Sequence, residues 1–578
     1  MTDDQTGERR LNRRTLLEGA LAAGGAIAAG STIGHLVAGA SKASAKVPPA
    51  PTGAPNILVV MVDQMREPLG LLSDAAVASL MPNLARIRRA GVSFGNHYTA
   101  ANDCTPSRGA LVTGLYGHQT GCLVTGGSTL SPQFPTWGTM LRENGYLTAW
   151  FGKWHLTGHD NRWTARDAHV LDSYGFSGGT YPSPDGGPGE GWRADPMIAA
   201  QFQSWYAKAP AKQPWCTTAS FVNPHDIAWW YRWSAQTATE RSAPSRVHAL
   251  PANFETAVDL MTRHKPRLQI SLQQTAATGF GPVSYSGPNA LKSWLPFMDL
   301  YLKLLGEVDR QIGVVLKALA SRPAIAAKTV VVFTSDHGEY GSSHGLRGKG
   351  GGVYDEALRV PLIVNDPRGK LNAAPTITRT GLTSSVDIAP LLLTIATGSN
   401  GWRKDSHYAQ IAHRHDLARM LTDPAAPGRP FVLHSTDEIL SEFAIEPYAS
   451  NAPLHVTAIR TPKAKYAIYS NWKYNANTVN TVGQERELYD YSSPNGVLEL
   501  DNLATHSPLE PALDAQLSSA IRSELREPVP RRLVPAQRDG YADYFTTAKT
   551  SALVAASQRR KLEESEPPSK AAEKLGQP

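Results

Sequence analysis

The chain has 578 residues, of which 41% are hydrophobic and 19% charged, and its formal net charge is +7. This composition is that of a globular protein large enough for a substantial core, and it excludes a disordered or fibrous chain. The basic residues are scattered, without a Lys/Arg run or an aromatic-interleaved stripe, so we expect no nucleic-acid partner. The mild positive excess at most favours anionic substrates.

The first 45 residues are predicted to be an export signal. Arg13 and Arg14 precede a Gly/Ala-rich, weakly apolar run over 19–40, and Ala43-Ser44-Ala45 offers a small-residue cleavage site. A permanent membrane anchor is the alternative, but the run lacks the Leu, Ile and Val density of a spanning helix. We therefore expect the twin-arginine export machinery as a partner and a periplasmic or secreted location.

Strands that alternate with helices predict an α/β fold. After a linker at 46–55, the nearly continuous apolar run at 56–62 is typical of a strand buried on both faces of a parallel sheet. An amphipathic helix over 82–89, stopped by Gly91, follows it. We expect a large, mostly parallel sheet with helices on both faces over 56–400. Further strand-like runs occur at 146–151, 217–222, 329–334 and 360–364, and an apolar helix face occurs over 304–319.

The sequence changes in character beyond about residue 400. Short runs typical of antiparallel strands occur at 456–461, 466–469 and 487–490, and a helix is expected near 513–525. They predict a smaller C-terminal antiparallel-sheet subdomain over 401–545. The polar tail over 546–578 is expected to be a surface helix or disordered. The least regular part, 158–296, is expected to supply the walls of a substrate pocket.

Polar residues follow the predicted strands at the points where the strands end. In an α/β sheet of this kind, ligands bind beyond the carboxyl ends of the strands. Each polar cluster alone could be a capped loop, but their recurrence at successive strand ends predicts one shared site. The clusters are Asp63-Gln64, Lys153-Trp154-His155, Asn223-Pro224-His225 and Asp336-His337-Gly338.

Cys104-Thr105-Pro106-Ser107-Arg108 is the most informative stretch of the chain. Interpreted locally it is a helix start, with Thr105 or Ser107 as the cap and Pro106 preset for an early turn. It also resembles the formylglycine motif of type I sulfatases, in which the cysteine thiol is oxidised to an aldehyde. That resemblance implies conversion of Cys104 to 3-oxoalanine (formylglycine) by a formylglycine-generating enzyme.

The chain resembles the sulfatases of the alkaline phosphatase superfamily from Asn56 to about Leu503. The resemblance implies a sulfuric ester hydrolase, similar to arylsulfatases, that acts on a small-molecule or glycan sulfate ester. Gln64 stands where many sulfatases have a second Asp, and His337 where many have Asn; both variants resemble the branch of phosphonate monoester hydrolases and choline-sulfatase-like enzymes. Besides the clusters above, the matching pieces are Pro82-Asn83-Leu84, Lys349, Arg359-Val360-Pro361, Glu487-Leu488-Tyr489-Asp490 and Asp501-Asn502-Leu503.

One divalent cation is predicted at the strand ends. Two carboxylates roughly balance a 2+ ion, and a His among the ligands suits Mn²⁺ better than an all-oxygen set would, although Ca²⁺ remains an alternative. Each Asp taken singly could instead cap a turn, but the two together at two strand ends favour a metal. The expected ligands are Asp63, Gln64, Asp336, His337 and an oxygen of modified residue 104.

A sulfate monoester resists attack because its peripheral oxygens are negative. We hypothesise that the aldehyde at residue 104 hydrates to a gem-diol and that one hydroxyl attacks sulfur, giving a covalent sulfate ester. The alcohol would leave with a proton from His225 or Lys349. The second hydroxyl would lose its proton to His155 and expel sulfate, a route that a plain Ser or Cys cannot follow.

The remaining candidate residues are cations. Arg108 would steady the gem-diol oxygens, and Lys153 and Lys349 would bind sulfate oxygens as compact charges. Taken singly, a solvated Lys or a satisfied loop His is the commoner case.

Several residues keep two interpretations. Cys122 and Cys216 could be free and buried, or paired in an oxidising compartment. His344 is near enough to Lys349 to enter the site, but a structural loop role is favoured. The tryptophans after His225 could be ordinary core or a substrate wall; they are Trp229, Trp230 and Trp233.

Three other functions compete with sulfate ester hydrolysis. A phosphodiesterase or phosphonate monoester hydrolase with the same aldehyde is the nearest, because the metal, Lys and His set stabilises phosphoryl oxygens equally well. A two-zinc phosphatase is disfavoured, since no second complete ligand set is visible. An exported binding protein would not need a candidate for every catalytic role.

Overall fold

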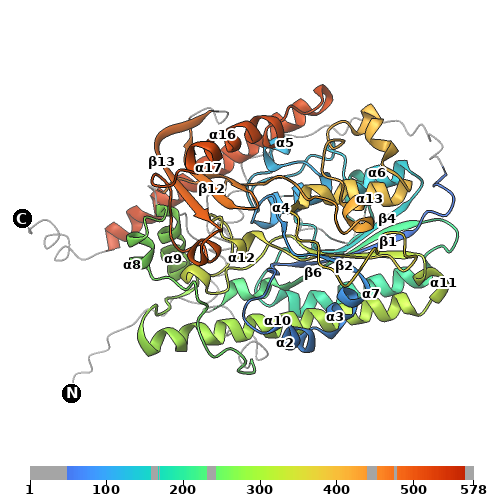
Figure 1. The fold of residues 1–578 in the computed structure, drawn as a ribbon, viewed down its shortest axis with the longest axis horizontal. Helices are drawn as coiled ribbons and strands as arrows, with labels where there is room; N and C mark the ends of the chain where they lie inside the picture. Colours follow the sequence, from blue (N-terminus) through green and yellow to red (C-terminus); the bar gives the residue numbers. More distant parts are fainter. Residues whose placement is uncertain are drawn as a thin grey trace, which may run out of the picture.

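The computed structural model describes residues 49–157, 164, 167, 169–230, 243–438, 452–473 and 478–565 (Figure 1). The predicted export signal over 1–45 and Trp233 lie outside these residues. Among the described helices, none combines the length and the apolar character that crossing a bilayer requires.

A seven-stranded sheet forms the centre of the molecule (Figure 1). The strands from β7 to β5 pair in parallel, whereas β8 runs antiparallel to both of its neighbours. The predicted large, mostly parallel sheet is confirmed. In spatial order its strands are β2 (Val92–Phe94), β8 (Leu362–Asn365), β7 (Thr329–Ser335), β1 (Asn56–Asp63), β6 (Trp215–Pro224), β4 (Leu147–Gly152) and β5 (Ser177–Gly178).

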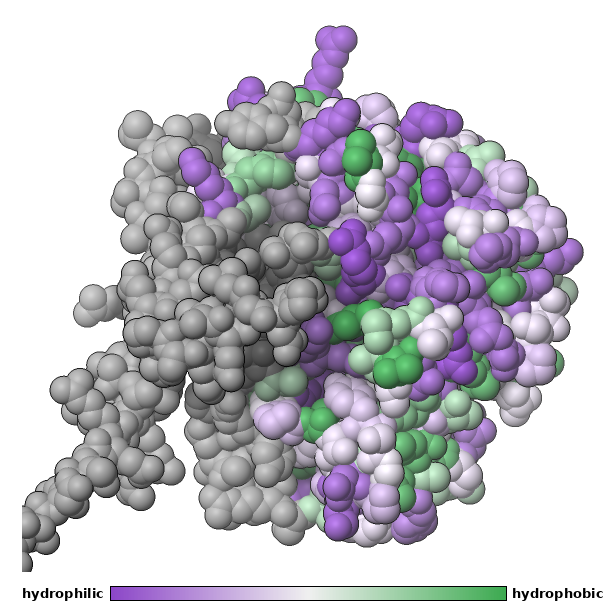
Figure 2. Space-filling view, turned by 90° about the vertical axis from the view of Figure 1, so that its left-hand side faces the viewer, coloured by the Kyte–Doolittle hydropathy of each residue, from purple (hydrophilic) through white to green (hydrophobic). Residues whose placement is uncertain are grey.

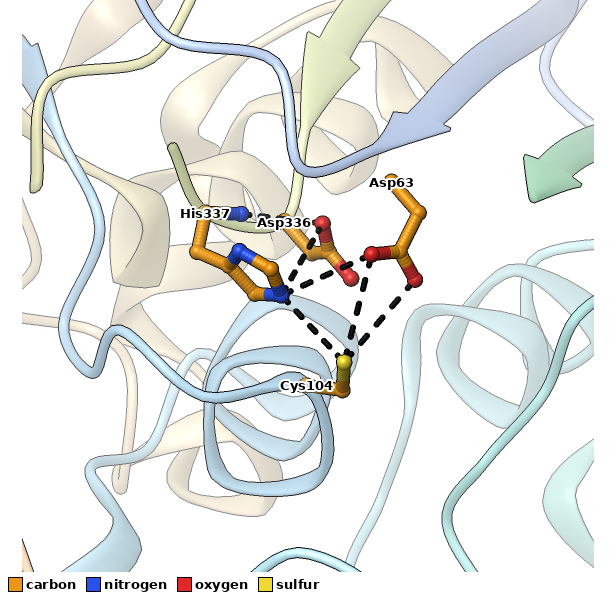
Figure 3. A group of neighbouring side chains, drawn as sticks. All are labelled: Asp63, Cys104, Asp336 and His337. Carbon is orange, nitrogen blue, oxygen red and sulfur yellow. Dashed lines mark hydrogen bonds and ion pairs between the residues drawn. The ribbon is translucent and has the colours of Figure 1, made fainter. Parts of the chain in front are cut away.

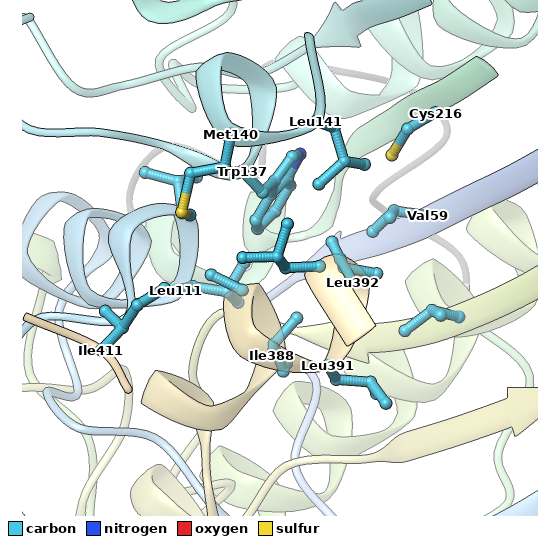
Figure 4. Close-up of a cluster of buried hydrophobic side chains, with 14 of the residues drawn as sticks. Val59, Leu111, Trp137, Met140, Leu141, Cys216, Ile388, Leu391, Leu392 and Ile411 are labelled. Atoms are coloured by element: carbon cyan, nitrogen blue, oxygen red, sulfur yellow. The ribbon is translucent and has the colours of Figure 1, made fainter. Parts of the chain in front are cut away.

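β1 lies inside the sheet because its side chains are apolar on both faces, and all of its residues are buried. Val59 and the other odd-numbered residues face a core that includes Trp137 and Leu392 (Figure 4). Val60 and the other even-numbered residues face a second core. Burying one such side chain contributes about 1.5–3 kcal/mol, so a charged residue on either face would be strongly destabilising.

Helices cover both faces of the sheet, as predicted (Figure 1). The core around Val59 is closed by α4 (Cys104–Thr113), α6 (Trp137–Glu143) and α13 (Ile388–Thr397). The core around Val60 is closed by α3 (Pro82–Ala90), α7 (Glu190–Lys208) and α10 (Gly287–Ala320). α3 ends at Ala90 and has Gly91 as its C-cap, the residue at which the helix over 82–89 was expected to stop.

The described part of the span 158–296 is more regular than the sequence indicates. It contains α7, β6, α8 (Ala257–Thr262), α9 (Arg267–Phe280) and the first part of α10. α10 begins well before the predicted 304–319 because Trp294 and Phe297 continue its buried face, and Pro296 lies inside the helix. The Gly- and Pro-rich loops of this span obscure its helical periodicity in the sequence.

A four-stranded antiparallel sheet forms the C-terminal part, which confirms the second half of the predicted fold class. Its strands are β10 (Val432–Thr436), β11 (His455–Arg460), β12 (Ala464–Trp472) and β13 (Val479–Asp490). α16 (Glu510–Ala520) packs Leu517 against Ile459 and Tyr466 of this sheet. α17 (Val534–Ser565) then passes close to Leu123 through Tyr544.

Figure 2 shows that, on one side of the molecule, hydrophilic and hydrophobic residues are interspersed over the coloured surface rather than gathered in one apolar patch.

Short elements complete the described fold. The short elements are α2 (Asp74–Leu80), α5 (Gly117–Thr120), α11 (Pro323–Ala326), α12 (Asp355–Leu358), α14 (Leu417–Thr422), α15 (Pro494–Val497), and the strand pair β3 (His97–Tyr98) and β9 (Thr383–Ser384).

Candidate active site

The carboxyl ends of four neighbouring strands bring the predicted site residues together. β7, β1, β6 and β4 are parallel neighbours, so their ends lie along one edge of the sheet. Cys104 reaches this edge as the first residue of α4. All of these side chains are buried. The strands place there Asp336 after β7, Asp63 at the end of β1, His225 after β6 and Lys153 after β4.

The Cys104 side chain lies among charged groups (Figure 3). Its Sγ is 3.2 Å from Nε2 of His337, 3.9 Å from each carboxylate oxygen of Asp63 and 3.6 Å from Nζ of Lys153. Burial raises the pKa of the Cys104 thiol, but Lys153, Lys349 and His337 outweigh it and hold that pKa well below its usual range. A negatively charged atom at this position is therefore stabilised.

Arg108 holds the two aspartates in place. It follows Cys104 by one helical turn on α4, so both side chains face the same edge of the sheet. Its Nε donates to Asp336 Oδ2 at 2.8 Å and its Nη2 to Asp63 Oδ2 at 2.9 Å, while Nη1 donates to the Lys153 carbonyl oxygen at 2.7 Å. The planar guanidinium fork thus fits the pair of carboxylates, and the contact of Arg108 with gem-diol oxygens stays a prediction.

The two carboxylates differ in their electrostatic surroundings. Burial would raise the pKa of Asp63, but Lys153, His225 and Arg108 hold it well below its usual range. Burial and the charge of Asp63 raise the pKa of Asp336. Like charges at close range separate two pKa values in this way, so the pair attracts positive charge.

The donor set fits a divalent cation. Asp63, Cys104, Asp336 and His337 each offer one ligand atom, and these atoms lie within 4.8 Å of one another. Nδ1 of His337 is 3.0 Å from the Gly338 carbonyl oxygen, which can only accept, so a neutral ring keeps its lone pair on Nε2, towards Cys104. Burial lowers the pKa of His337, but the charge of Asp336 raises it to about 9. The cluster thus favours a positive charge at this position.

Gln64 and Lys349 meet beside this cluster. The Gln64 backbone has a left-handed φ of 72°, and its N–H donates to Asp336 Oδ1 at 3.1 Å. Its Oε1 accepts from Nζ of Lys349 at 2.7 Å. A left-handed non-glycine residue is uncommon and is often found at functional sites. The structure therefore brings both predicted residues to the site, with the Gln64 carbonyl directed at the lysine.

His155 and His225 are buried bases on the remaining side. His155, with a left-handed φ of 56°, lies near enough to Cys104 to affect the pKa of its thiol, and burial together with Lys153 lowers the pKa of His155. Burial, Lys153 and Lys349 lower the pKa of His225 to about 3. Both rings are therefore neutral at neutral pH and can accept a proton.

A close backbone approach fixes the His225 ring. A Cβ added to Gly186 would lie 2.5 Å from Cε1 of His225, and the Gly186 carbonyl oxygen accepts from Nε1 of Trp229 at 2.6 Å. Only glycine fits at position 186, where φ is 101°. Trp229 and Trp230 are buried here, so they line the region of His225 as well as belonging to the core.

Two residues of the site were missed by the sequence analysis. Ser220, in the interior of β6, accepts from Nη1 of Arg108 at 3.1 Å and donates to the Lys153 carbonyl oxygen at 2.8 Å. Glu339 accepts from Nε2 of Gln64 at 2.5 Å. A serine within a strand gives no sequence signal, whereas Glu339 could have been noticed as an acid two residues after a predicted ligand.

The residues with two interpretations have structural roles. Cys122 and Cys216 are free, and burial raises the pKa of both thiols. Nδ1 of His344 donates to Glu255 Oε2 at 2.6 Å, and its ring stacks on Tyr354 with 3.5 Å between centroids. This matches the structural loop role that the sequence favoured for His344.

Two other groups of possible ligand atoms occur among the described residues. Neither shares a residue with the cluster at Cys104, so the described residues do not supply the adjoining second site of a two-metal phosphatase. In the first group, Asp437 already accepts from both imidazoles and from Nε1 of Trp472. The groups are His118, Asp437 and His455, and His344, Glu356 and Glu499.

Comparison with known proteins gives consistent matches. The family model described as Sulfatase matches residues 55–399. Choline-sulfatase of Rhizobium meliloti is 27% identical over 500 residues, which cover 81% of this chain and 86% of that protein. Arylsulfatase K of Rattus norvegicus is 27% identical over 493 residues, or 81% and 78% of the two chains. The structure of a phosphonate monoester hydrolase from Silicibacter pomeroyi shares the fold, with a TM-score of 0.57 and 21% identity over 81% of this chain and 94% of that one.

Proposed function

Because this chain belongs to the sulfatase family and is a sulfuric ester hydrolase, we propose that it cleaves its substrate with a formylglycine made from Cys104 and with one divalent cation. The observation that carries the proposal is the position of Cys104 Sγ, 3.2 Å from His337 and 3.9 Å from Asp63. A residue-104 oxygen in place of this sulfur would touch both the cation ligands and the bases.

The cation would be held by Asp63, Asp336 and His337, with the Gln64 carbonyl and residue 104 as further ligands. It would screen the negative oxygens of a sulfate group and lower the pKa of a hydroxyl bound to it. The mixed carboxylate and imidazole set suits Mn²⁺, and Ca²⁺ is the alternative. The aldehyde, once hydrated, would supply one hydroxyl as the nucleophile for sulfur and a second whose deprotonation releases sulfate.

The other residues of the site would fill the remaining roles in binding and proton transfer. Lys153 and Lys349 would bind sulfate oxygens as compact cations. His155, neutral and near residue 104, would take the proton of the second hydroxyl. Of the two expected proton donors, Lys349 would give the proton to the leaving alcohol, because the low pKa of His225 leaves that ring neutral. Arg108 would hold the carboxylates of Asp63 and Asp336 in fixed positions relative to each other, and its hydrogen bonds to both support this role.

The pH dependence of kcat/KM tests the role of His155. A base must be unprotonated, and burial with Lys153 lowers the pKa of His155 below its ordinary value of 6.5. Activity should therefore persist as the pH falls through 6.5 and decline only at lower pH, where the ring gains its proton. An acid limb at or above pH 6.5 would contradict this assignment, and the limb should disappear from the residual activity of His155→Ala.

The substrate class is proposed to be a small-molecule or glycan sulfate ester. A phosphodiester or phosphonate monoester is the alternative, because the same lysines and cation would stabilise phosphoryl oxygens. The test is a panel of aryl sulfate, sulfated sugar, phosphodiester and phosphonate monoester, assayed on protein made with its formylglycine-generating enzyme. Sulfate esters should give the highest kcat/KM; a preference for a phosphonate or phosphodiester would reassign the substrate.

We also propose export by the twin-arginine machinery to the periplasm or the medium, from the residues around Arg13 and Arg14. Mass spectrometry of the exported protein reads two features at once, cleavage after Ala45 and loss of the thiol at Cys104. Metal analysis of the same sample measures how many divalent cations are bound per protein molecule. An unmodified thiol together with no metal would favour a binding protein on this fold over an enzyme.

A further inference from the structure

The carboxylate of Glu339 lies between two residues of the site and has been given no role so far. Its side chain is fully buried. Oε2 accepts from Nε2 of Gln64 at 2.5 Å, while Oε1 accepts from the backbone N–H groups of Gly341 at 2.9 Å and Gly348 at 2.7 Å. One carboxylate thus joins the end of β1 to the loop that carries Lys349.

This contact determines which way the Gln64 amide points. A lysine ammonium can only donate, so the Gln64 atom that meets Lys349 must be the carbonyl oxygen. The Gln64 NH₂ then faces Glu339, whose Oε2 accepts its hydrogen bond. If Glu339 could not accept, the buried Gln64 NH₂ would lose this acceptor in the orientation that Lys349 requires. The two partners together therefore fix the orientation of the Gln64 amide.

The loop from Glu339 to Lys349 depends on the same carboxylate. Gly341 and Gly348 have left-handed φ values of 58° and 78°, and Tyr340 N donates to the Gly348 carbonyl oxygen at 2.9 Å. Glu339 Oε1 therefore holds the two ends of the loop, at Gly341 and Gly348, together. Lys349 follows directly after Gly348, and its charge lowers the pKa of Cys104, so Lys349 lies on the side of the loop that faces Cys104.

We propose that Glu339 is a positioning residue that directs the Gln64 carbonyl oxygen towards Lys349 and the cation site and fixes Lys349 beside it. The proposal rests on the proposed function, because it assigns Gln64 as a ligand of the cation. Residues behind the ligands of a metal typically change its affinity about 10- to 100-fold when they are altered.

The test exchanges the two side chains. In Glu339→Gln, the new oxygen can still accept from Gly341 and Gly348, but the new NH₂ then faces the NH₂ of Gln64. Turning the Gln64 amide would instead set its NH₂ against the Lys349 ammonium, so neither orientation satisfies both neighbours and the Gln64 carbonyl is no longer held in place. We expect Mn²⁺ affinity, measured by calorimetry on the purified full chain, to fall about 10- to 100-fold. The double variant Glu339→Gln with Gln64→Glu restores an acceptor towards both neighbours and should bind Mn²⁺ more tightly than Glu339→Gln does.

A matched control separates this role from general loop stability. Glu356 is a neighbouring acid whose Oε1 accepts from Asn253 at 2.8 Å and has no contact with Gln64 among the described residues. Glu356→Gln should leave Mn²⁺ affinity unchanged. If Glu339→Gln alone does not fold, a folded double variant that binds Mn²⁺ still supports the proposal, since the exchange keeps every hydrogen bond.

Three results would overturn the proposal. Unchanged Mn²⁺ affinity in Glu339→Gln would show that Gln64 needs no partner. A double variant that binds no better than Glu339→Gln, or that does not fold, would reduce Glu339 to a structural role in the loop. A wild-type protein that binds no Mn²⁺ or Ca²⁺ would instead contradict the proposed function itself, and the ligand role of Gln64 with it.

Discussion

Replacing Cys104 by alanine is expected to lower kcat/KM for sulfate esters by at least about 10⁴-fold, because it removes the group proposed as the nucleophile. The fold should be retained, since Cys104 is one small side chain on a helix whose other residues remain buried. Steady-state kinetics and a thermal unfolding curve measure the two effects separately. Substantial residual hydrolysis in a folded Cys104→Ala protein would remove the proposed mechanism.

Cys104→Ser is the matched control for this result. A serine hydroxyl could attack sulfur, but it has no second hydroxyl whose deprotonation would expel sulfate. A single turnover that stops at one equivalent of alcohol, with a mass increase on residue 104, is therefore expected. Continuous turnover by the serine variant would show that the aldehyde is not required.

Arg108→Met is expected to destabilise the protein by about 3–5 kcal/mol when a chelator is present, because it leaves Asp63 and Asp336 buried without their shared counter-charge. Saturating Mn²⁺ should reduce this loss, since a cation bound by the same carboxylates would balance their charge. Denaturant unfolding with chelator and with Mn²⁺ measures both values. A loss that is the same in both conditions would argue against a cation between these aspartates.

The control for this variant is Arg88→Met. Arg88 also pairs with an acid, Glu67, but its side chain is 34% exposed, so the pair lies near the surface. Exposed ion pairs contribute at most about 1 kcal/mol, with or without a divalent cation. A similar loss in both variants would mean that the burial of the Arg108 pair does not matter.

The architecture could be predicted because each strand is read from a short, local pattern. The apolar run that became β1 required burial on both faces, and the polar residues after each strand marked the edge where ligands bind. The reversed direction of β8 could not be predicted, since strand direction depends on pairing with a neighbour, and the residues at 360–364 are apolar in either direction.

Within the site, the sequence indicates which residues belong there, but it does not indicate which atoms of those residues contact one another. The motif around Cys104 identified Arg108 as important, yet its three-way contact with Asp63, Asp336 and Lys153 depends on how three separate strands meet. Glu339 has the same limitation, because its partners are backbone N–H groups and an amide from another part of the chain. Hydrogen bonds to backbone atoms leave no pattern in the sequence.

A single turn of α4 sets the distance between Cys104 and Arg108. Cys104 is the proposed nucleophile and Arg108 binds both aspartates, so helix pitch sets the distance between residue 104 and the carboxylates. Inserting one residue between them would rotate Arg108 about 100° around the helix axis and point it away from the aspartates. Helix geometry by itself therefore requires the spacing between Cys104 and Arg108, whatever the proposed oxidation of Cys104 also requires of it.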